Sequence, residues 1–212
     1  MLVGLCGRSG SGKGYIAAMF ADRGVPSVDT DAVYRGMTGP AVTLSPCMEA
    51  LVERFGCGIL TPDNALDRAA MRSLVFTDGS DPAAAEQCRQ NLTDLNHITH
   101  RFILAETERI AAKHSANGAD IVLIDAPLLY ESGFDAHCAA VICVSAPEEL
   151  RIHRIMKRDG IDRSAAEKRL RTQMAQKLLM EKADYVIEND ADRETLYSRV
   201  DRVIEDLRRR KA

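Results

Sequence analysis

Short apolar runs alternate with stretches of helical periodicity along this chain of 212 residues, and this alternation constrains the fold more than any other feature. The runs are Leu2–Cys6, Val25–Val28, Ile121–Ile124, Ala139–Val144 and Tyr185–Ile187. They lack strict apolar–polar alternation, so both faces of each strand are expected to be buried, as in a parallel sheet covered by helices. Strands that alternate with helices favour right-handed crossovers. We therefore predict an α/β fold, a three-layer doubly wound parallel sheet of about five strands.

Two regions interrupt this alternation. Residues 45–117 have a helical pattern almost throughout and are too long for one crossover helix, so we predict a helical insertion. Residues 147–182 are also helical but charged, with eight Lys or Arg against five Asp or Glu between positions 148 and 173. For this second region, a solvated helical hairpin and a mobile lid that supplies cations to phosphates both remain open. The predicted core consists of residues 1–44, 118–146 and 183–212.

Two long amphipathic helices are expected. One covers residues 92 to about 114, and the other begins near Arg193. The second helix carries an apolar stripe of Leu196, Val200, Val203, Ile204 and Leu207. Its basic end, Arg208–Lys211, fits a helix C-terminus better than a nucleic-acid patch. Because the net charge of −3 also argues weakly against a dedicated nucleic-acid binder, we predict no nucleic-acid partner.

Composition narrows the class of protein further. Hydrophobic residues make up 46% and charged residues 28%, which is ordinary for a globular protein whose core needs no disulfide or metal. No apolar run approaches the roughly 18–20 residues of a membrane span, and the N-terminus lacks the features of a signal peptide. The six cysteines form no Cys-x-x-Cys pair, and Cys6 and Cys143 lie in apolar runs. We therefore predict a cytoplasmic protein without membrane contact, and a monomer because no exposed heptad pattern is present.

The motif with the clearest chemistry is Gly7-Arg8-Ser9-Gly10-Ser11-Gly12-Lys13, which fits G-x-x-x-x-G-K, the phosphate-binding loop or P-loop. An apolar strand precedes it and a helix predicted over residues 15–23 follows, which disfavours an ordinary Gly-rich turn. Its glycines let backbone N–H groups turn inward around a phosphate, and the helix N-terminus adds partial positive charge. Lys13 can reach the β- and γ-phosphates and acts there as a catalytic group. The predicted nucleotide-binding residues here are Gly7, Ser9, Gly10, Ser11, Gly12, Lys13, Gly14 and Tyr15.

One residue departs from the P-loop pattern, which calls for Ser or Thr after the lysine. Gly14 stands there, and the hydroxyl it lacks normally binds Mg²⁺. Three interpretations remain open. The ion is held by water and carboxylates, or Ser11 substitutes for the hydroxyl, or catalysis is impaired.

Three aspartates follow predicted strands, whose carboxyl ends line the ligand crevice of a doubly wound sheet. Asp29 and Asp31 lie at the end of the second strand and can point to one side if the backbone there is extended. Asp31 is the candidate base for a phosphoryl acceptor. Asp125 ends the third strand at a Walker B-like position and is the candidate Mg²⁺ ligand, with Asp31 acting through water. The plainer interpretations are helix caps for the first two and a strand-end cap for Asp125.

A series of short phrases accompanies the P-loop in a fixed order. They are Asp29-Thr30-Asp31 with Arg35, Phe55–Leu60, Leu66-Asp67-Arg68, Val75-Phe76, Leu95–His100, Asp125–Gly133, Arg154–Asp159, Arg169–Met174 and Ala183–Asn189. The P-loop alone indicates only a nucleotide-binding chain. The ordered set resembles the dephospho-CoA kinase family nearly from end to end.

This resemblance implies that ATP, bound with Mg²⁺, transfers its γ-phosphoryl group to the ribose 3′-hydroxyl of dephospho-CoA. The products would be CoA and ADP, in the last step of coenzyme A biosynthesis. By analogy, Asp31 is the base on that hydroxyl, Arg35 holds a substrate phosphate, and residues 45–117 form the CoA-side domain. The implied substrate-binding residues are Asp29, Arg35, Asp67, Arg68, Asn96, His100 and Arg169.

The resemblance also assigns residues to the nucleotide side. Arg154 and Arg158 would come from a lid, bind the nucleotide phosphates and stabilise transition-state charge. Asn189 would lie near the adenine, where its amide can pair with a base edge. Plainer interpretations remain for several of these residues: a surface ion pair of Arg158 with Asp159, a simple turn at Asn189, and a structural histidine at His100.

Four residues depart from the family pattern: Gly14, Asn64 where Gly is usual, Arg101 where Pro is usual, and Leu179 where Lys is common. Two rival functions therefore accompany the leading one. A nucleoside or nucleotide monophosphate kinase would share the P-loop, lid and acceptor domain. A protein that binds nucleotide without turnover is supported only by Gly14.

Overall fold

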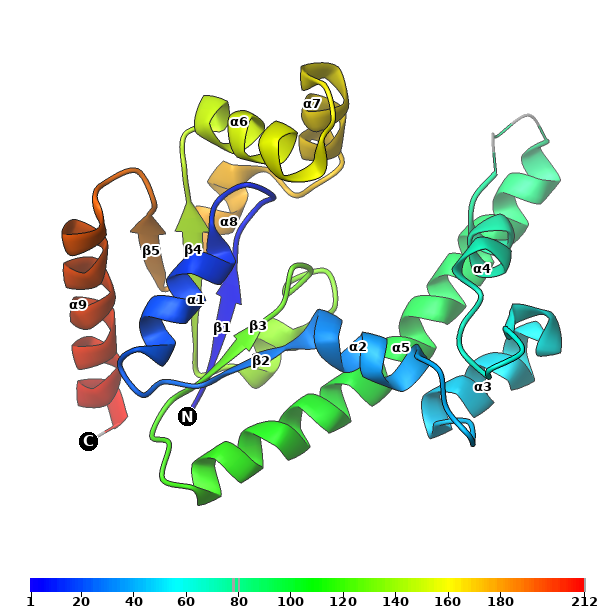
Figure 1. Cartoon of the computed structure of the whole chain (residues 1–212), viewed down its shortest axis with the longest axis horizontal. Coiled ribbons are helices and arrows are strands. Elements are labelled where there is room, and N and C mark those ends of the chain that lie inside the picture. The colour runs from blue at the N-terminus through cyan, green and yellow to red at the C-terminus, as the bar shows by residue number, and fades with distance from the viewer. Residues whose placement is uncertain (78, 80, 212) are drawn as a thin grey trace. The chain divides into compact units, whose positions relative to one another are not determined.

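A computed structural model describes residues 1–77, 79 and 81–211 of the chain. Its five strands form one parallel sheet in the order β2-β3-β1-β4-β5 (Figure 1). The strands are β1 (Leu2–Cys6), β2 (Ser27–Asp29), β3 (Val122–Asp125), β4 (Ala140–Ser145) and β5 (Tyr185–Glu188). Each overlaps one of the predicted apolar runs, so the prediction of an α/β fold with a parallel sheet is confirmed.

Helices fill most of the remaining chain. They are α1 (Lys13–Ala21), α2 (Thr30–Thr38), α3 (Pro46–Phe55), α4 (Arg68–Val75), α5 (Pro82–Ala116), α6 (Glu148–Asp159), α7 (Arg163–Arg171), α8 (Gln176–Lys182) and α9 (Arg193–Lys211), with short 3-10 helices η1 (Cys57–Ile59) and η2 (Phe134–His137). Within the described part of the chain, no helix has the length and apolarity needed to cross a membrane.

Helix α5 is longer than the sequence pattern indicates, because it begins at Pro82 and not near Leu92. Its first turns contain mainly alanine and polar residues, which form helix readily but show no apolar periodicity. Asp81 accepts a hydrogen bond from the Ala83 N–H at 2.9 Å, which satisfies one donor of the first turn. The helix start is therefore set by a cap and by proline at the first position, and not by an amphipathic stripe.

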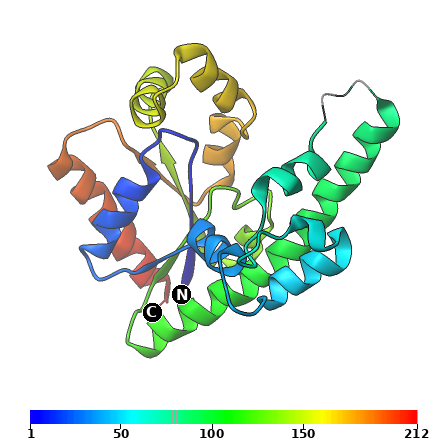
Figure 2. The ribbon, with the colours of Figure 1, turned by 45° about the vertical axis from the view of Figure 1, so that its right-hand side comes forward.

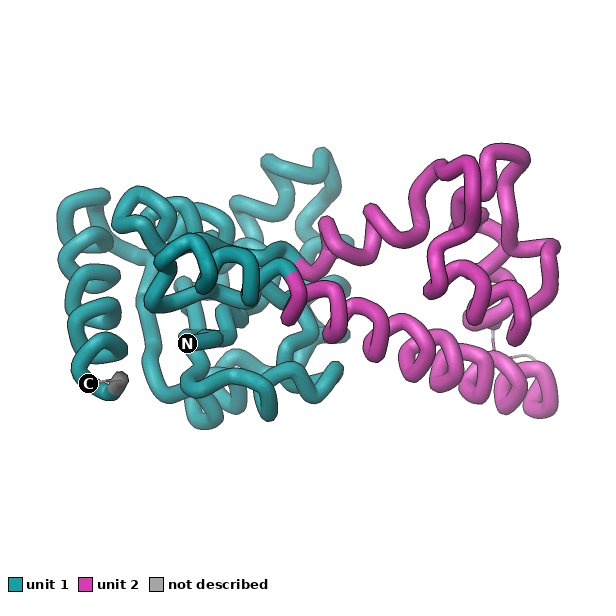
Figure 3. Tube along the Cα trace, turned by 90° about the horizontal axis from the view of Figure 1, so that it is seen from below, with its two compact units in different colours: residues 1–29, 110–212 teal, residues 30–109 magenta. Residues whose placement is uncertain are grey.

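The chain divides into two compact units (Figure 3). Unit 1 contains residues 1–29 and 110–212, and unit 2 contains residues 30–109. Unit 2 takes in most of the range 45–117 that the sequence suggests as a helical insertion, together with α2. Unit 1 contains the whole sheet, the P-loop and the helical range 147–182.

Helices α1 and α9 cover one face of the sheet in unit 1 (Figures 1 and 2). Leu5 of β1, Ile142 of β4, Phe20 of α1 and Leu207 of α9 belong to one buried apolar cluster there. The predicted stripe of α9 supplies its five apolar residues to the same cluster, so this amphipathic helix is confirmed. Burial of this continuous apolar surface holds β1 and α1 in place, and the P-loop joins them.

The opposite face is covered more irregularly. A Cβ atom added to Gly4 would lie 2.7 Å from Leu129 Cδ2, so the segment after β3 packs directly on β1. Helix α8 packs against β4. Cys6 and Cys143 are opposite each other in the β1–β4 register, and both are buried, as expected for cysteines in apolar runs. The sheet is thus the middle of three layers.

Unit 2 has an apolar cluster of its own, built from α3, η1, α4 and neighbouring helices. Ser45 caps α3, accepting from the Met48 N–H at 3.1 Å. Asn64 has φ 61, a left-handed conformation that glycine adopts freely and asparagine tolerates better than most residues. Asn64 also donates from Nδ2 to the Ala41 carbonyl at 3.1 Å. The replacement of the family's usual glycine is therefore accommodated locally.

Candidate active site

The carboxyl edge of the sheet gathers the P-loop and several predicted functional residues of unit 1. The loop leaves β1 at Cys6 and enters α1 at Lys13, with Gly10 at φ 77 and Gly12 at φ 85. Residues with a side chain rarely adopt such left-handed backbone conformations, so glycine is required at both positions. Gly12 precedes the first residue of α1, and the first N–H groups of a helix, which have no acceptor within it, can bind an anion. The loop thus has the geometry of a phosphate cradle.

A carboxylate pair lies beside the P-loop lysine. Lys13 Nζ forms an ion pair with Asp125 Oδ1. Asp29, the last residue of β2, is opposite Asp125 in the parallel register. Paired residues on neighbouring strands place their side chains on the same face, so two carboxylates share this corner of the edge. The site therefore combines one ammonium for phosphate with oxygen ligands for a hard cation.

This donor set fits Mg²⁺ in the way that nucleotide enzymes use it. Mg²⁺ prefers oxygen ligands and keeps several waters, so one or two carboxylates with substrate phosphates suffice. Among the described residues, no cluster of three or more His, Cys, Asp or Glu could hold a metal without such help. Asp125 and its neighbour Asp29 match this requirement for a shared cation.

Asp31 lies in a helix. Helix α2 begins at Thr30, immediately after β2, so Asp31 is in its first turn. The condition that Asp29 and Asp31 share an extended backbone is therefore not met, because side chains alternate only along a strand. A carboxylate in the first turn interacts favourably with the helix dipole, which is a local reason for aspartate here. Asp31 belongs to unit 2, whereas Asp29 belongs to unit 1.

Two residues that lie far from the P-loop in the sequence donate hydrogen bonds to its carbonyl groups. Arg154 of α6 donates from Nη1 to the carbonyls of Gly10 at 3.2 Å and Ser11 at 3.3 Å. Asn189, directly after β5, donates from Nδ2 to the Ser11 carbonyl at 2.8 Å. Arg154 Nη2 also reaches the Asn189 carbonyl at 3.3 Å. In this structure Arg154, predicted as a catalytic cation, binds loop carbonyls.

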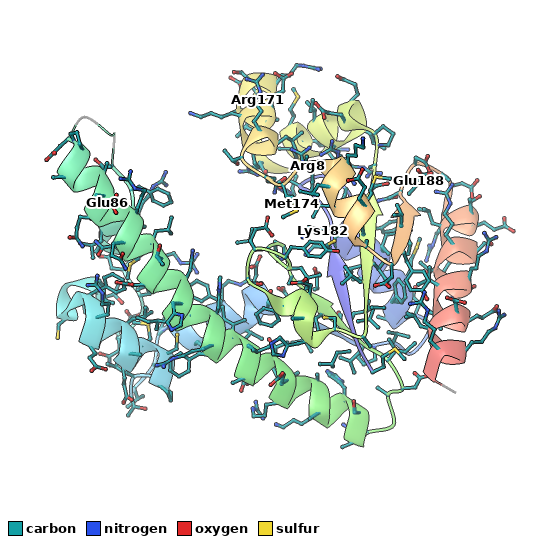
Figure 4. The ribbon with its side chains drawn as sticks, turned by 180° about the vertical axis from the view of Figure 1, so that it is seen from behind. Arg8, Glu86, Arg171, Met174, Lys182 and Glu188 are labelled. Carbon is teal, nitrogen blue, oxygen red and sulfur yellow. The ribbon has the colours of Figure 1, made fainter. Side chains whose placement is uncertain are left out.

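The start of the loop is bound by the end of α7 and the segment after it. The Ser9 N–H donates to Gln173 Oε1 at 3.0 Å, and Gln173 Nε2 donates to Ser9 Oγ at 3.0 Å. Arg8 donates from Nη2 to the Leu170 carbonyl, and Figure 4 shows Arg8 and Met174 in this part of unit 1. Gln173 is a site residue that the sequence assignment missed. The only feature of the sequence that could have pointed to Gln173 is its place in the family phrase Arg169–Met174.

Two other arginines of the helical range 147–182 are held by one carboxylate. Arg158 pairs with Asp159 at 2.7 Å, and Arg169 pairs with the same residue. The Arg158 hydrogen bond, together with the charges of Arg158 and Arg169, lowers the pKa of Asp159 to about 2. The ion pair that the sequence left as the plainer interpretation of Arg158 is therefore present. A phosphate that binds either arginine must compete with Asp159.

The predicted substrate-side residues all belong to unit 2, apart from Asp29 and Arg169. Arg35 is in the last turn of α2, and Arg68 begins α4. The Asp67 carboxylate caps α4, accepting from the N–H groups of Ala69 at 2.9 Å and Ala70 at 3.0 Å.

Asn96 and His100 are four residues apart in α5 and therefore lie on one face of that helix. Burial, and then the nearby charge of His97, lower the pKa of His100. His100 is thus favoured in its neutral form, with ring nitrogens that can both donate and accept a hydrogen bond.

Comparisons with known proteins show the family to which the chain belongs. A family model described as dephospho-CoA kinase matches residues 1–195. The dephospho-CoA kinase of Anaeromyxobacter dehalogenans is 35% identical over 207 residues, which cover 98% of this chain and 92% of that protein.

Two solved structures are also similar. TT1252 from Thermus thermophilus has a TM-score of 0.74 at 27% identity, over 97% of this chain and 96% of that one. The dephospho-CoA kinase of Campylobacter jejuni has a TM-score of 0.63 at 21% identity, over 100% of this chain and 98% of that one, which supports the fold.

Proposed function

The chain belongs to the dephospho-CoA kinase family, and from this premise we propose how its residues divide the work of the reaction. The enzyme transfers a phosphoryl group from ATP to the ribose 3′-hydroxyl of dephospho-CoA, which gives CoA and ADP. The observation that carries our assignment is the ion pair of Lys13 with Asp125 beside the P-loop. It places an ammonium and a carboxylate together where the triphosphate and its cation are expected.

Lys13 and the loop N–H groups would neutralise charge on the ATP phosphates. When a phosphate binds, the Lys13 ammonium would exchange its contact with Asp125 for phosphate oxygens, and the Asp125 carboxylate would become available to the cation. Phosphoryl transfer needs mainly positioning and charge stabilisation, which such preorganised groups supply. Arg154 and Arg158 would add charge once ATP phosphates replace their present partners, and Arg169 would bind the substrate.

Asp31 would orient the 3′-hydroxyl and take its proton. Its sequence position supports this role, because Asp31 follows the carboxyl end of β2 by two residues, and its place in the family phrase is the same. Arg35, one turn further along α2, would bind a substrate phosphate. Asp67, Arg68, Asn96 and His100 would contact the CoA moiety, with Asp67 also serving as the cap of α4.

Mg²⁺ bound with ATP would neutralise the charge that develops on the phosphates during transfer. We assign its protein ligands to Asp125 directly and to Asp31 through water. The ion pair of Asp125 with Lys13 supports the direct ligand, because it places this carboxylate beside the P-loop, where Gly14 supplies no hydroxyl.

Gly14→Ser tests how the ion is held. No heavy atom lies within 4 Å of a Cβ built on Gly14, which is exposed in α1, so the serine fits without strain. The new hydroxyl is expected to lower the Mg²⁺ concentration for half-maximal rate by about fivefold, the scale of one polar contact. The measurement is an Mg²⁺ titration of the rate at saturating substrates. Gly14→Ala is the matched control and should leave the titration unchanged; equal titration curves for serine and glycine would contradict this account.

The remaining assignments concern the enzyme as a whole. We propose that it acts as a cytoplasmic monomer on small molecules, without nucleic acid. The net charge of −3 and the ion-paired basic end of α9, where Arg210 lies 3.5 Å from Asp184, support this proposal. Sedimentation at micromolar concentration, with and without substrates, measures the oligomeric state.

A further inference from the structure

Asn189 is a buried polar residue at the end of the central layer of unit 1, with only 3% of its surface exposed. Its backbone N–H donates to the Ser145 carbonyl at 2.7 Å, which fixes it at the end of β5. Its side chain crosses to the P-loop and donates from Nδ2 to the Ser11 carbonyl at 2.8 Å. A buried amide held at both its backbone and its side chain has little freedom, so it fixes the group it binds.

The bound group is the peptide between Ser11 and Gly12. Peptide bonds are planar, and the chain has no cis peptide in its described part, so the Ser11 carbonyl and the Gly12 N–H point in opposite directions. With the carbonyl held toward Asn189, the Gly12 N–H is turned away from Asn189. In a loop that binds phosphate through inward N–H groups, that is the direction of the ligand.

The contact leaves no room for a side chain at Gly12. A Cβ atom built there would lie 2.0 Å from Asn189 Nδ2, and φ at Gly12 is +85. The glycine is therefore needed for the approach of Asn189 as well as for the turn. Arg154 binds the same carbonyl at a longer distance, 3.3 Å, and comes from α6, so Asn189 makes the shorter contact.

We propose that Asn189 is a positioning residue of the phosphate cradle, whose carboxamide sets the Ser11–Gly12 peptide so that the Gly12 N–H meets a phosphate oxygen. This inference rests on the proposed function of the P-loop as the ATP triphosphate site. It differs from the base-pairing role that the family resemblance implies, because one N–H of the carboxamide already donates to the protein backbone and the residue is only 3% exposed. The ligand it serves is a polyphosphate, not adenine.

The experiment separates the two parts of ATP. Binding of inorganic tripolyphosphate and of adenosine is measured by calorimetry on the full chain and on Asn189→Asp and Asn189→Ala. Asn189→Asp replaces the donor with an acceptor facing the Ser11 carbonyl, and Asn189→Ala removes the donor without adding charge. Asn117→Asp, at an exposed position after α5, is the matched control for the added charge.

Both Asn189 variants are expected to bind tripolyphosphate at least about tenfold more weakly, since the Ser11 carbonyl loses the shorter of its two side-chain hydrogen bonds. Their adenosine affinity should stay within about twofold of the parent chain, and Asn117→Asp should match the parent for both ligands. Asn189→Asp should regain tripolyphosphate affinity between pH 8 and pH 5 relative to Asn189→Ala, because burial raises the pKa of a carboxyl at this position and the protonated form can donate to Ser11. A selective loss of adenosine binding, or unchanged tripolyphosphate binding, would overturn the proposal.

A measurement on the unaltered chain gives a test that does not depend on how the variants fold. Tripolyphosphate should shift the Gly12 amide proton downfield in an NMR titration, as expected for an N–H that gains a charged acceptor. An unshifted Gly12 amide at saturation would also overturn the proposal. If the chain binds tripolyphosphate in this way but phosphorylates no dephospho-CoA, the proposed function fails and the role of Asn189 stands.

Discussion

Asp31→Asn is expected to lower kcat by about 10²- to 10⁴-fold, the usual contribution of a general base, while the KM for ATP changes far less. Asparagine keeps the size of aspartate and can still accept a hydrogen bond, but it cannot take the proton of the 3′-hydroxyl. Steady-state kinetics of ADP release with dephospho-CoA measures the effect. The loss falls mainly on kcat because the proton moves in the chemical step.

Two comparisons make the Asp31 result specific. Asp201→Asn is the matched control, since Asp201 is a half-buried residue of α9 that pairs with Arg23 at 2.6 Å and has no assigned role in the reaction. An Mg²⁺ titration then separates the two roles assigned to Asp31, because excess Mg²⁺ would restore a lost ion-binding role but not a lost base. An Asp31→Asn enzyme that keeps kcat within about threefold of the parent would show that another group handles the proton.

Lys13→Met is expected to reduce kcat/KM for ATP by about 10²- to 10³-fold, the scale of removing one preorganised charge from a developing phosphoryl transition state. Methionine preserves most of the side-chain length and apolar stem but removes the ammonium. The change also takes one partner from Asp125, so thermal unfolding must be recorded beside the kinetics. The affinity for dephospho-CoA should change much less than that for ATP.

Lys13→Arg distinguishes charge from geometry. A guanidinium keeps the positive charge but is planar and bulkier than an ammonium, so it should recover only part of the activity. A methionine variant whose kcat/KM stays within about threefold of the parent would remove Lys13 from the mechanism. Equal losses of ATP and dephospho-CoA affinity would point instead to a general structural fault.

The sheet and the P-loop could be predicted because their signals are local. Each strand is a short apolar run, and the loop is a contiguous motif between a strand and a helix. The start of α5 was missed because Pro82 and the alanines after it give a helix cap and propensity without an apolar stripe. The sequence left Asp31 open between an extended backbone and a helix cap, because no glycine or proline separates β2 from α2 to mark where the helix begins.

Long-range polar contacts could not be predicted from the sequence. Asn189 and Ser11 are 178 positions apart, and Gln173 and Ser9 are 164 apart, so only the packing of the sheet brings them together. The pairing of Arg158 with Asp159 was weighed because the residues are adjacent, whereas the second pairing, Arg169 with Asp159, depends on how α6 and α7 pack. Charge patterns identify cations but not the partners that hold them.

The most direct test of the central claim is product analysis with competing acceptors. The purified chain is incubated with ATP, Mg²⁺ and dephospho-CoA, with AMP or adenosine in parallel, and ADP release is followed while phosphorus NMR locates the new phosphate. The account predicts turnover with dephospho-CoA alone and a phosphate on the ribose 3′-oxygen. Phosphorylation of AMP or adenosine, or ATP binding without any turnover, would contradict it.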